Sequence, residues 1–476
     1  MSTLKRFFKD TVIYGLATVL PRVMGIILVR LHTDALPRDG YADVASFYVG
    51  AAFLNIILTY GMETAFFRFF SKSDQKEKVY STVFISLTAS TLLISLLLYA
   101  CKTPILQVLE LPASYFWYLA GVVLLDTLVV APFAYLRARG KALRFAGFKL
   151  ANLCIYVVLN FFFLWAIPKF DWQFSWYDTT DVRQYIFIAN LAASVVTLLL
   201  ILPEFFRVKA VFDKRIFKKL WSYGWPIMIA GLAFVVNEQL DKLFINKMMD
   251  KDIGGAYAAC YKIAVFMTIF IQAFRLGAEP FFFNHAKEKN AAGTYALILK
   301  YFVIVGAFGL LLITAFVDII KNELIKNASY HLAMEIVPYV LLANLCLGIY
   351  HNLAVWYKLT DKTKYGMYFS IIGAMITICL NVFLIPVIGF MASAYATLAA
   401  YGTMMILSYT FGKKYYPIPY ELKRISTYLL LAIVGSGISF YIFRANYLVS
   451  AILLGIFALV IFFMERKQLK AILKRS

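Results

Sequence analysis

Long apolar stretches alternate with short polar segments along the whole chain. Each stretch has about 20 residues, the length that an α-helix needs to cross the hydrocarbon core of a bilayer. None of the polar segments between them is large enough to fold by itself. The pattern predicts an all-α polytopic membrane protein with about 14 transmembrane helices, at residues 11–32, 44–70, 79–101, 115–136, 145–167, 184–206, 222–246, 253–278, 296–317, 335–357, 365–388, 390–411, 425–443 and 446–464.

The first stretch, residues 11–32, differs from a cleaved signal peptide. It is longer than the apolar region of such a peptide, and it contains Arg22 and Arg30. No small-residue cleavage site follows it. We therefore expect it to be the first membrane span.

Composition supports the membrane assignment. The chain is 62% hydrophobic and 15% charged, whereas soluble proteins have about 45–50% apolar and about 25% charged residues. A soluble globular protein is therefore excluded.

The chain has a formal net charge of +21, and the positions of the basic residues explain this excess. Alternate segments hold about 30 Lys and Arg, against about 9 in the intervening loops, which is the asymmetry of the positive-inside rule. Both termini are therefore expected in the cytoplasm, and the basic segments are expected to contact anionic membrane lipids without any nucleic-acid partner. The basic segments are Lys5–Lys9, Lys72–Lys78, Arg137–Arg144, Arg207–Lys219, Lys287–Lys289, Lys358–Lys364, Lys413–Arg424 and Arg466–Arg475.

Cysteine and histidine give no sign of a metal or redox site. The five cysteines lie in or beside predicted spans without short spacings, and the four histidines are scattered. The sequence lacks metal-ligand spacing and a glycine-rich phosphate loop. We expect no metal, no cofactor and no enzymatic activity.

The chain also repeats itself. At a shift of 216 positions, residues 41–42 (Tyr-Ala) fall on residues 257–258, and residues 61–63 fall on residues 277–279. Six spans separate equivalent points, so the repeat is parallel, and parallel-repeat transporters bind substrate between their halves. We expect two pseudo-symmetric six-helix bundles and an appended pair of helices, at residues 1–210, 211–412 and 413–476.

Charged residues within predicted spans are the candidate binding residues, because charge at membrane depth is costly and usually lines a cavity. The cations expected to bind a lipid diphosphate are Arg22, Arg30, Lys242 and Lys262. The acids expected to balance them, or to bind a coupling cation, are Glu238, Asp241 and Asp126. The alternative is that Glu238 or Asp241 pairs with a nearby cation and holds helices together. We favour the cavity.

A second group of charges lies near the predicted cytoplasmic ends of spans. Arg275 and Glu279 are four positions apart, so an ion pair within one helix is their first explanation. Glu63 is the repeat equivalent of Glu279, and Arg68 is close to it in sequence. The alternative hypothesis is that these four residues form a cytoplasmic gate.

Residues 380–397 carry a family resemblance. This tract contains Asn381, is predicted to break at Pro386 and Gly389, and continues with small residues that allow close helix packing. It resembles the penultimate hairpin of bacterial polysaccharide transporters, the O-antigen flippase branch of the multidrug/oligosaccharidyl-lipid/polysaccharide (MOP) exporter superfamily. Residues 30–33 and 60–70 resemble the opening hairpin of that family.

The resemblance implies two six-helix lobes around a V-shaped cavity. It implies translocation of an undecaprenyl-diphosphate-linked oligosaccharide, an O-antigen, capsule or exopolysaccharide unit, from the cytoplasmic to the outer leaflet. The implied location is the bacterial cytoplasmic (inner) membrane, and the implied protein partners are polysaccharide-assembly proteins.

Three alternatives stay open. Residues 21–25 resemble the Ser-Arg-Val-Leu-Gly stretch of lipid II flippases, which implies that Arg22 contacts a diphosphate, although the further arginines of that family's second helix are missing. A membrane polysaccharide polymerase or ligase would need a large outer loop with catalytic Arg and His, which the sequence lacks. Cation-coupled drug export would fit twelve spans better than fourteen.

Overall fold

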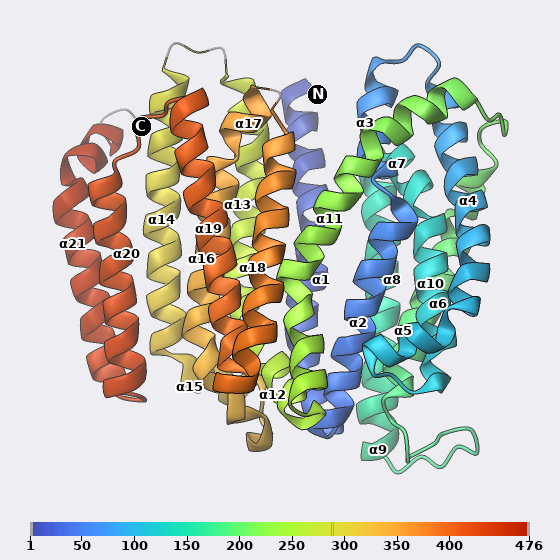
Figure 1. Cartoon of the computed structure of the whole chain (residues 1–476), viewed down its shortest axis with the longest axis horizontal. Coiled ribbons are helices and arrows are strands. Elements are labelled where there is room, and N and C mark those ends of the chain that lie inside the picture. Colours follow the sequence, from blue (N-terminus) through green and yellow to red (C-terminus); the bar gives the residue numbers. More distant parts are fainter. Residues whose placement is uncertain (1–2, 287, 289, 361, 474–476) are drawn as a thin grey trace. The chain divides into compact units, whose positions relative to one another are not determined.

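The computed structural model describes residues 3–286, 288, 290–360 and 362–473, and every element within them is a helix (Figure 1). The predicted all-α class is confirmed. Twelve helical stretches in this part of the chain have the length and hydropathy of membrane spans, and they coincide with twelve of the predicted spans.

The remaining two predicted spans lie in helices that are long enough but more polar. Residues 11–32 lie in α1 (Thr3–Ala35), which has 33 residues, and residues 390–411 lie in α19 (Met391–Tyr415), which has 25. Charged residues in α1 and small polar residues in α19 lower their hydropathy. The count of fourteen spans stays a prediction.

Packing divides the chain into two compact units. Unit 1 comprises the chain up to Ala259 together with residues 381–390, and unit 2 comprises Cys260–Leu380 and the chain from Met391 onward. The lobes inferred from the repeat stay a prediction.

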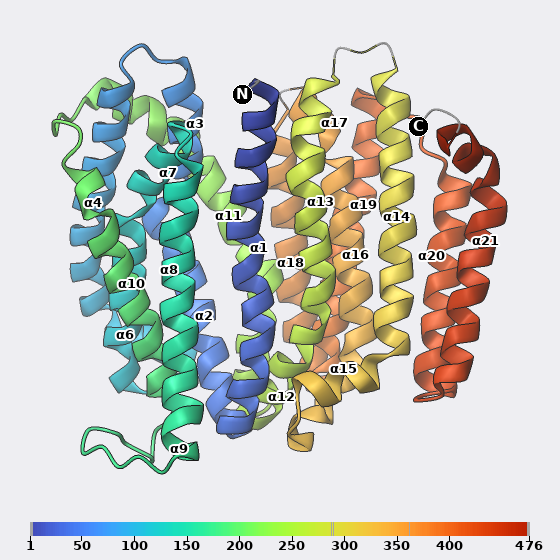
Figure 2. The same ribbon diagram turned by 180° about the vertical axis from the view of Figure 1, so that it is seen from behind.

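Unit 1 is a bundle in which α2 packs against α6 and α11, and α8 packs against α1 and α10. In Figure 2, α1, α8 and α10 lie in the foreground. Besides α1, its elements are α2 (Arg38–Thr59), α3 (Met62–Lys72), α4 (Lys76–Ala100), α5 (Lys102–Leu109), η1 (Ala113–Tyr115), α6 (Phe116–Leu128), α7 (Val130–Ala138), α8 (Ala142–Phe161), η2 (Phe162–Ala166), α9 (Ile167–Lys169), α10 (Gln184–Phe205), α11 (Lys214–Met248) and most of α12 (Lys251–Tyr261).

Unit 2 is a second bundle, in which α16 packs against α19 and α14 packs against α20 and α21. The last two helices are the predicted appended pair, and they lie along α14 (Figure 1). Besides α19, its elements are η3 (Lys262–Ala264), α13 (Val265–Asn284), α14 (Ala291–Ala315), α15 (Val317–Leu324), η4 (Ala328–Ile336), α16 (Val337–Leu353), α17 (Val355–Leu359), most of α18 (Lys364–Ile388), α20 (Leu422–Gly437), η5 (Ile438–Ile442) and α21 (Tyr447–Leu473).

The break predicted at Pro386 is wrong. Helix α18 continues through Pro386 to Ile388. It ends because Gly389 adopts a left-handed conformation with φ +65°, while its N–H donates to the carbonyl of Ile385 at 2.9 Å. Glycine accepts this conformation at a helix C-terminus without the steric cost that a Cβ brings. The other predicted break, at Gly389, is confirmed.

Candidate functional site

Unit 1 contains a polar cavity of about 470 Å³ between α2, α3, α6, α7, α8 and α10. Its uncharged polar groups are three amides and three hydroxyls, from Asn55, Asn152, Asn190, Thr59, Ser194 and Thr197. Its charged groups come from Glu63, Asp126, Arg137 and Lys149. Two of the predicted site residues, Glu63 and Asp126, therefore line one cavity.

A break between α2 and α3 places Glu63 at this cavity. Tyr60 and Gly61 both have positive φ, 33° and 72°, so the chain turns before α3 begins at Met62. A Cβ at Gly61 would collide with the carbonyl of Gly224 on α11, so only glycine fits this close approach.

The two acids of the cavity have different partners. The carboxylate of Glu63 accepts a hydrogen bond from Arg137 Nη1 at 2.8 Å, and both side chains are partly exposed. Asp126 Oδ1 accepts a hydrogen bond from the Ser194 hydroxyl at 2.8 Å. These contacts join α3 to α7 and α6 to α10, so they also fix the cavity walls.

Lys149 is the cavity's remaining cation. Its ammonium lies 4.5 Å from the centre of the Phe133 ring, a cation–π contact. The side chain is solvent-accessible and within electrostatic reach of Asp126 and Glu63. Within the described residues no hydrogen bond or ion pair involves its ammonium. Its donors therefore remain available to a ligand in the cavity.

Two residues of the predicted charge cluster on α11, Asp241 and Lys242, pair with each other. Lys242 is buried, its Nζ lies 3.0 Å from Asp241 Oδ1, and it donates to the carbonyl of Glu238 at 3.1 Å. Tyr257 donates its hydroxyl to Asp241 Oδ2 at 2.6 Å. These contacts favour the packing explanation for Asp241 and Lys242. Substrate binding by Lys242 stays a prediction.

The other predicted cations lie on elements other than α11. On α1, Arg22 is half-buried and Arg30 is exposed, and in unit 2 Lys262 is exposed in η3. Their assignment to a diphosphate site stays a prediction.

The four residues of the predicted gate are placed as follows. Glu63 pairs with Arg137. The Arg68 guanidinium lies 4.4 Å from the centre of the Tyr223 ring. Arg275 Nη1 lies 3.4 Å from the ring nitrogen Nε2 of His351. The side chain of Glu279 lies outside the described part of the structure. The gate stays a prediction.

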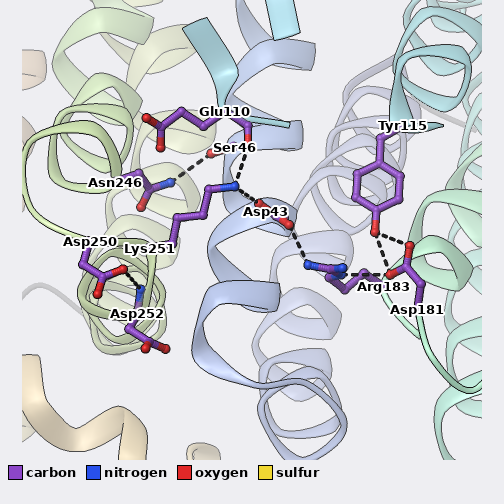
Figure 3. Close-up of polar contacts among 10 residues, drawn as sticks. All are labelled: Asp43, Ser46, Glu110, Tyr115, Asp181, Arg183, Asn246, Asp250, Lys251 and Asp252. Atoms are coloured by element: carbon purple, nitrogen blue, oxygen red, sulfur yellow. Dashed lines mark hydrogen bonds and ion pairs between the residues drawn. The ribbon is translucent and has the colours of Figure 1, made fainter. Parts of the chain in front are cut away.

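A second charge network of unit 1 centres on the buried Asp43 (Figure 3). Its carboxylate accepts from Arg183 Nη1 and Lys251 Nζ, each at 2.8 Å. Arg183 Nε donates to Asp181 at 2.8 Å, and Asp181 accepts the hydroxyl of Tyr115 at 2.6 Å. The network ties α2 to α12 and to the loop before α10.

Unit 2 contains a buried charge network as well. Lys300 is completely buried in α14, and its Nζ lies 2.8 Å from Glu421 and 2.9 Å from Glu465. Glu465 also accepts the hydroxyl of Tyr428 at 2.6 Å and pairs with Arg424 at 3.1 Å. These contacts bind the appended helices α20 and α21 to α14.

Sequence reasoning missed the roles of Lys149, Asp43 and Lys300. Asp43 lies one residue before a predicted span, and Lys149 lies near the start of another, so both positions suit interfacial residues. Lys300 is the fifth residue of the span predicted at 296–317, the same depth as Lys149 in its span. A lysine inside an apolar stretch is the signal that could have identified it and Lys149.

The cavity of unit 1 is suited to binding. It combines hydrogen-bond donors, acceptors and balanced charges inside an apolar helical bundle. Within the described residues, no group of three or more His, Cys, Asp or Glu could hold a metal ion.

The sequence matches two family profiles. A family described as "Polysaccharide biosynthesis protein" matches residues 7–278, and a family described as MatE matches residues 226–383. No curated protein sequence matches the chain.

Solved structures share the fold. The lipid II flippase MurJ in an inward closed conformation superposes with a TM-score of 0.75 and 15% identity, covering 96% of this chain and 100% of that one. An inward-facing MATE-family multidrug resistance transporter of the MOP superfamily superposes with a TM-score of 0.66 and 12% identity, covering 88% of this chain and 95% of that one. A MOP-superfamily transporter from Pyrococcus furiosus superposes with a TM-score of 0.59 and 14% identity, covering 87% of this chain and 96% of that one. At these identities the likeness establishes the fold.

Proposed function

Because the chain belongs to the polysaccharide biosynthesis protein family of the MOP superfamily, we propose that it is a flippase for lipid-linked oligosaccharides. It would move an undecaprenyl-diphosphate-linked oligosaccharide from the cytoplasmic to the outer leaflet of the bacterial inner membrane by alternating access. The repeat halves, residues 1–210 and 211–412, would be the moving lobes.

The observation that carries this proposal is the polar cavity of unit 1. An apolar helical bundle gains no stability from a hollow that holds Asp126 and Lys149 within predicted spans, because each charge at membrane depth costs a few kcal/mol on insertion scales. A polar ligand that must cross the membrane accounts for the hollow. A lipid-linked glycan is such a ligand, since its head group is polar while its lipid stays in the bilayer.

A lipid II flippase is the second candidate. The structural match to MurJ over 96% of this chain supports it. The substrates of both candidate functions carry a diphosphate, so Arg22 is the proposed ligand of that diphosphate in either case. The two functions differ only in the glycan that the protein accepts.

The test is a flipping assay in proteoliposomes that hold the purified protein. Two radiolabelled lipids are compared, lipid II and the undecaprenyl-diphosphate glycans extracted from the host's membranes after removal of lipid II. We expect faster outward movement of the extracted glycans. Faster movement of lipid II would establish the second candidate, and movement of neither lipid would overturn the proposal.

The variant Arg22→Ala tests the proposed ligand in the same assay. We expect it to reduce flipping by at least tenfold, because one charge-assisted contact to phosphate contributes about 1.5–3 kcal/mol. Arg22→Lys should restore part of the rate, since it keeps the charge but loses the bidentate geometry. Flipping by Arg22→Ala at the wild-type rate would remove Arg22 from the site.

A further inference from the structure

The cavity of unit 1 has hydrogen-bonding capacity that the protein does not use internally. Asp126 uses one carboxylate oxygen to accept from Ser194, and Asn152 uses its amide nitrogen to donate to Thr197 at 2.9 Å. Within the described residues, no hydrogen bond involves the other oxygen of Asp126, the amide oxygen of Asn152 or the ammonium of Lys149. Two acceptors and a triple donor are therefore available to a ligand.

The charges of the cavity are balanced. Its lining contains two acids, Glu63 and Asp126, and two bases, Arg137 and Lys149. A bare cation would meet the repulsion of the two basic groups, and a bare anion would meet that of the two acids. A neutral ligand with many hydroxyl groups meets neither, and it can use donors and acceptors at once.

The wall of the cavity also offers an apolar face. Phe133 and Phe145 both line it, and their ring centres lie 5.4 Å apart in an edge-to-face arrangement. A pyranose ring has hydroxyl groups around its edge and C–H groups on its faces. It therefore matches a site whose lining combines polar groups with aromatic rings. The cavity volume of about 470 Å³ lies within the range of about 300–1,000 Å³ found for small-molecule sites.

The geometry points to a sugar-binding subsite in this cavity, in which Lys149, Asp126 and Asn152 hydrogen-bond the glycan head group of the transported lipid. Lys149 is then a specificity-determining residue, since its three N–H groups meet hydroxyl oxygens of the sugar. This inference rests on the proposed function, because a lipid-linked glycan is the ligand that brings a sugar into the membrane. It goes further by assigning the sugar to unit 1 and to residues outside the proposed diphosphate site.

The experiment measures sugar preference in proteoliposomes. Outward flipping is compared for the extracted undecaprenyl-diphosphate glycans and for undecaprenyl diphosphate without sugar, and the ratio of the two rates is the readout. We expect the wild-type protein to prefer the glycosylated lipid. We expect Lys149→Met to lower the ratio by about tenfold, the effect of losing about 1.4 kcal/mol of binding free energy. Lys149→Arg should retain part of the preference, since it keeps the donors.

A matched control is Lys169→Met. The Lys169 ammonium lies 4.4 Å from the centre of the Trp165 ring, so it has a cation–π contact like that of Lys149, but it does not line the cavity. Its preference ratio should equal that of the wild-type protein. A second variant, Asn55→Ala, truncates a lining residue for which no side-chain hydrogen bond is present within the described residues, so it should fold normally and lower the ratio.

The outcomes separate the two proposals. Failure of the wild-type protein to flip the glycosylated lipid would overturn the proposed function. The sugar-binding subsite alone would be overturned if the wild-type protein flips the glycosylated lipid but Lys149→Met and Asn55→Ala both leave the ratio of the two flipping rates unchanged.

Discussion

Lys149 in unit 1 and Lys300 in unit 2 both lie within candidate membrane spans, yet their surroundings differ. Lys300 is completely buried and contacts two carboxylates, at 2.8 and 2.9 Å. Lys149 is solvent-accessible, lines a cavity, and has an aromatic ring as its described neighbour at 4.5 Å. Charge at membrane depth therefore has two uses in this molecule, and the partners of the charge distinguish them.

An intramembrane cation therefore identifies a ligand site only when its partners are counted. A lysine whose carboxylates come from neighbouring helices fixes those helices together. A lysine whose donors face an open polar cavity can exchange water for a ligand. The following substitutions test this distinction, in order of decreasing expected effect.

Lys300→Met should cause the largest loss of stability. It leaves the buried carboxylate of Glu465 without its ammonium partner, and breaking a buried pair in this way costs about 3–5 kcal/mol. The measurement is the thermal unfolding midpoint of the purified protein in detergent. Combining Lys300→Met with Glu465→Gln should recover part of the loss. An unfolding midpoint equal to that of the wild type would contradict a structural role for Lys300.

Tyr428→Phe should have the next largest effect. It removes the hydroxyl that donates to Glu465 at 2.6 Å, and a buried hydrogen bond to a charged group contributes about 1.5–3 kcal/mol. Tyr441→Phe is the matched control, because that hydroxyl makes an exposed contact of 3.3 Å with Tyr339. Equal unfolding midpoints for the two variants would show that the cluster around Glu465 does not hold α20 and α21.

Asp318→Asn should lower the stability of unit 2 by about 1 kcal/mol or less, because its partners are partly exposed. Burial alone would raise the pKa of the Asp318 carboxyl, but Lys321 at 2.6 Å and Arg444 at 3.2 Å lower it by more, so it lies below its ordinary value of 3.8. A depressed pKa means that this stabilisation is present above the ordinary pKa and is lost as the pH falls through the folded-state value. Unfolding midpoints measured from pH 7 to pH 3 should converge for the variant and the wild type only at the acid end. A constant difference over that range would contradict the ion-pair explanation.

Lys149→Met should have the smallest effect on stability. It removes a cation–π contact, which contributes about 0.5–1 kcal/mol at an accessible site, and no hydrogen bond or ion pair within the described residues. The unfolding midpoint should stay close to that of Lys169→Met. A loss as large as that of Lys300→Met would place Lys149 among the structural residues and remove the contrast between the two regions.

The sequence predicts the helical class and twelve of the spans well, because each span is a local property of about 20 consecutive residues. It predicts Asp126 and Glu63 as candidates because charge within or beside an apolar stretch is also a local signal. It does not predict the partners of these residues. Arg137 lies 74 positions from Glu63, and Ser194 lies 68 positions from Asp126, so only tertiary packing brings them together.

The same limit explains why the roles of Lys149 and Lys300 were missed, whereas the end of α18 is a local property. The break at Pro386 was expected from the missing N–H of proline, but the chain turns at Gly389, where the backbone requires a positive φ. Lys149 and Lys300 look alike in sequence, since each is a lysine within an apolar stretch. Their different roles depend on residues far along the chain, such as Glu421 and Glu465 for Lys300.

The most direct test of the contrast between the two lysines is an experimental structure of the protein with an undecaprenyl-diphosphate glycan from its host. We predict density for a sugar ring in the cavity of unit 1, within hydrogen-bonding distance of Lys149 and Asp126, with the contacts of Lys300 to Glu421 and Glu465 unchanged. Sugar density elsewhere in the protein, with the cavity occupied by water alone, would contradict it.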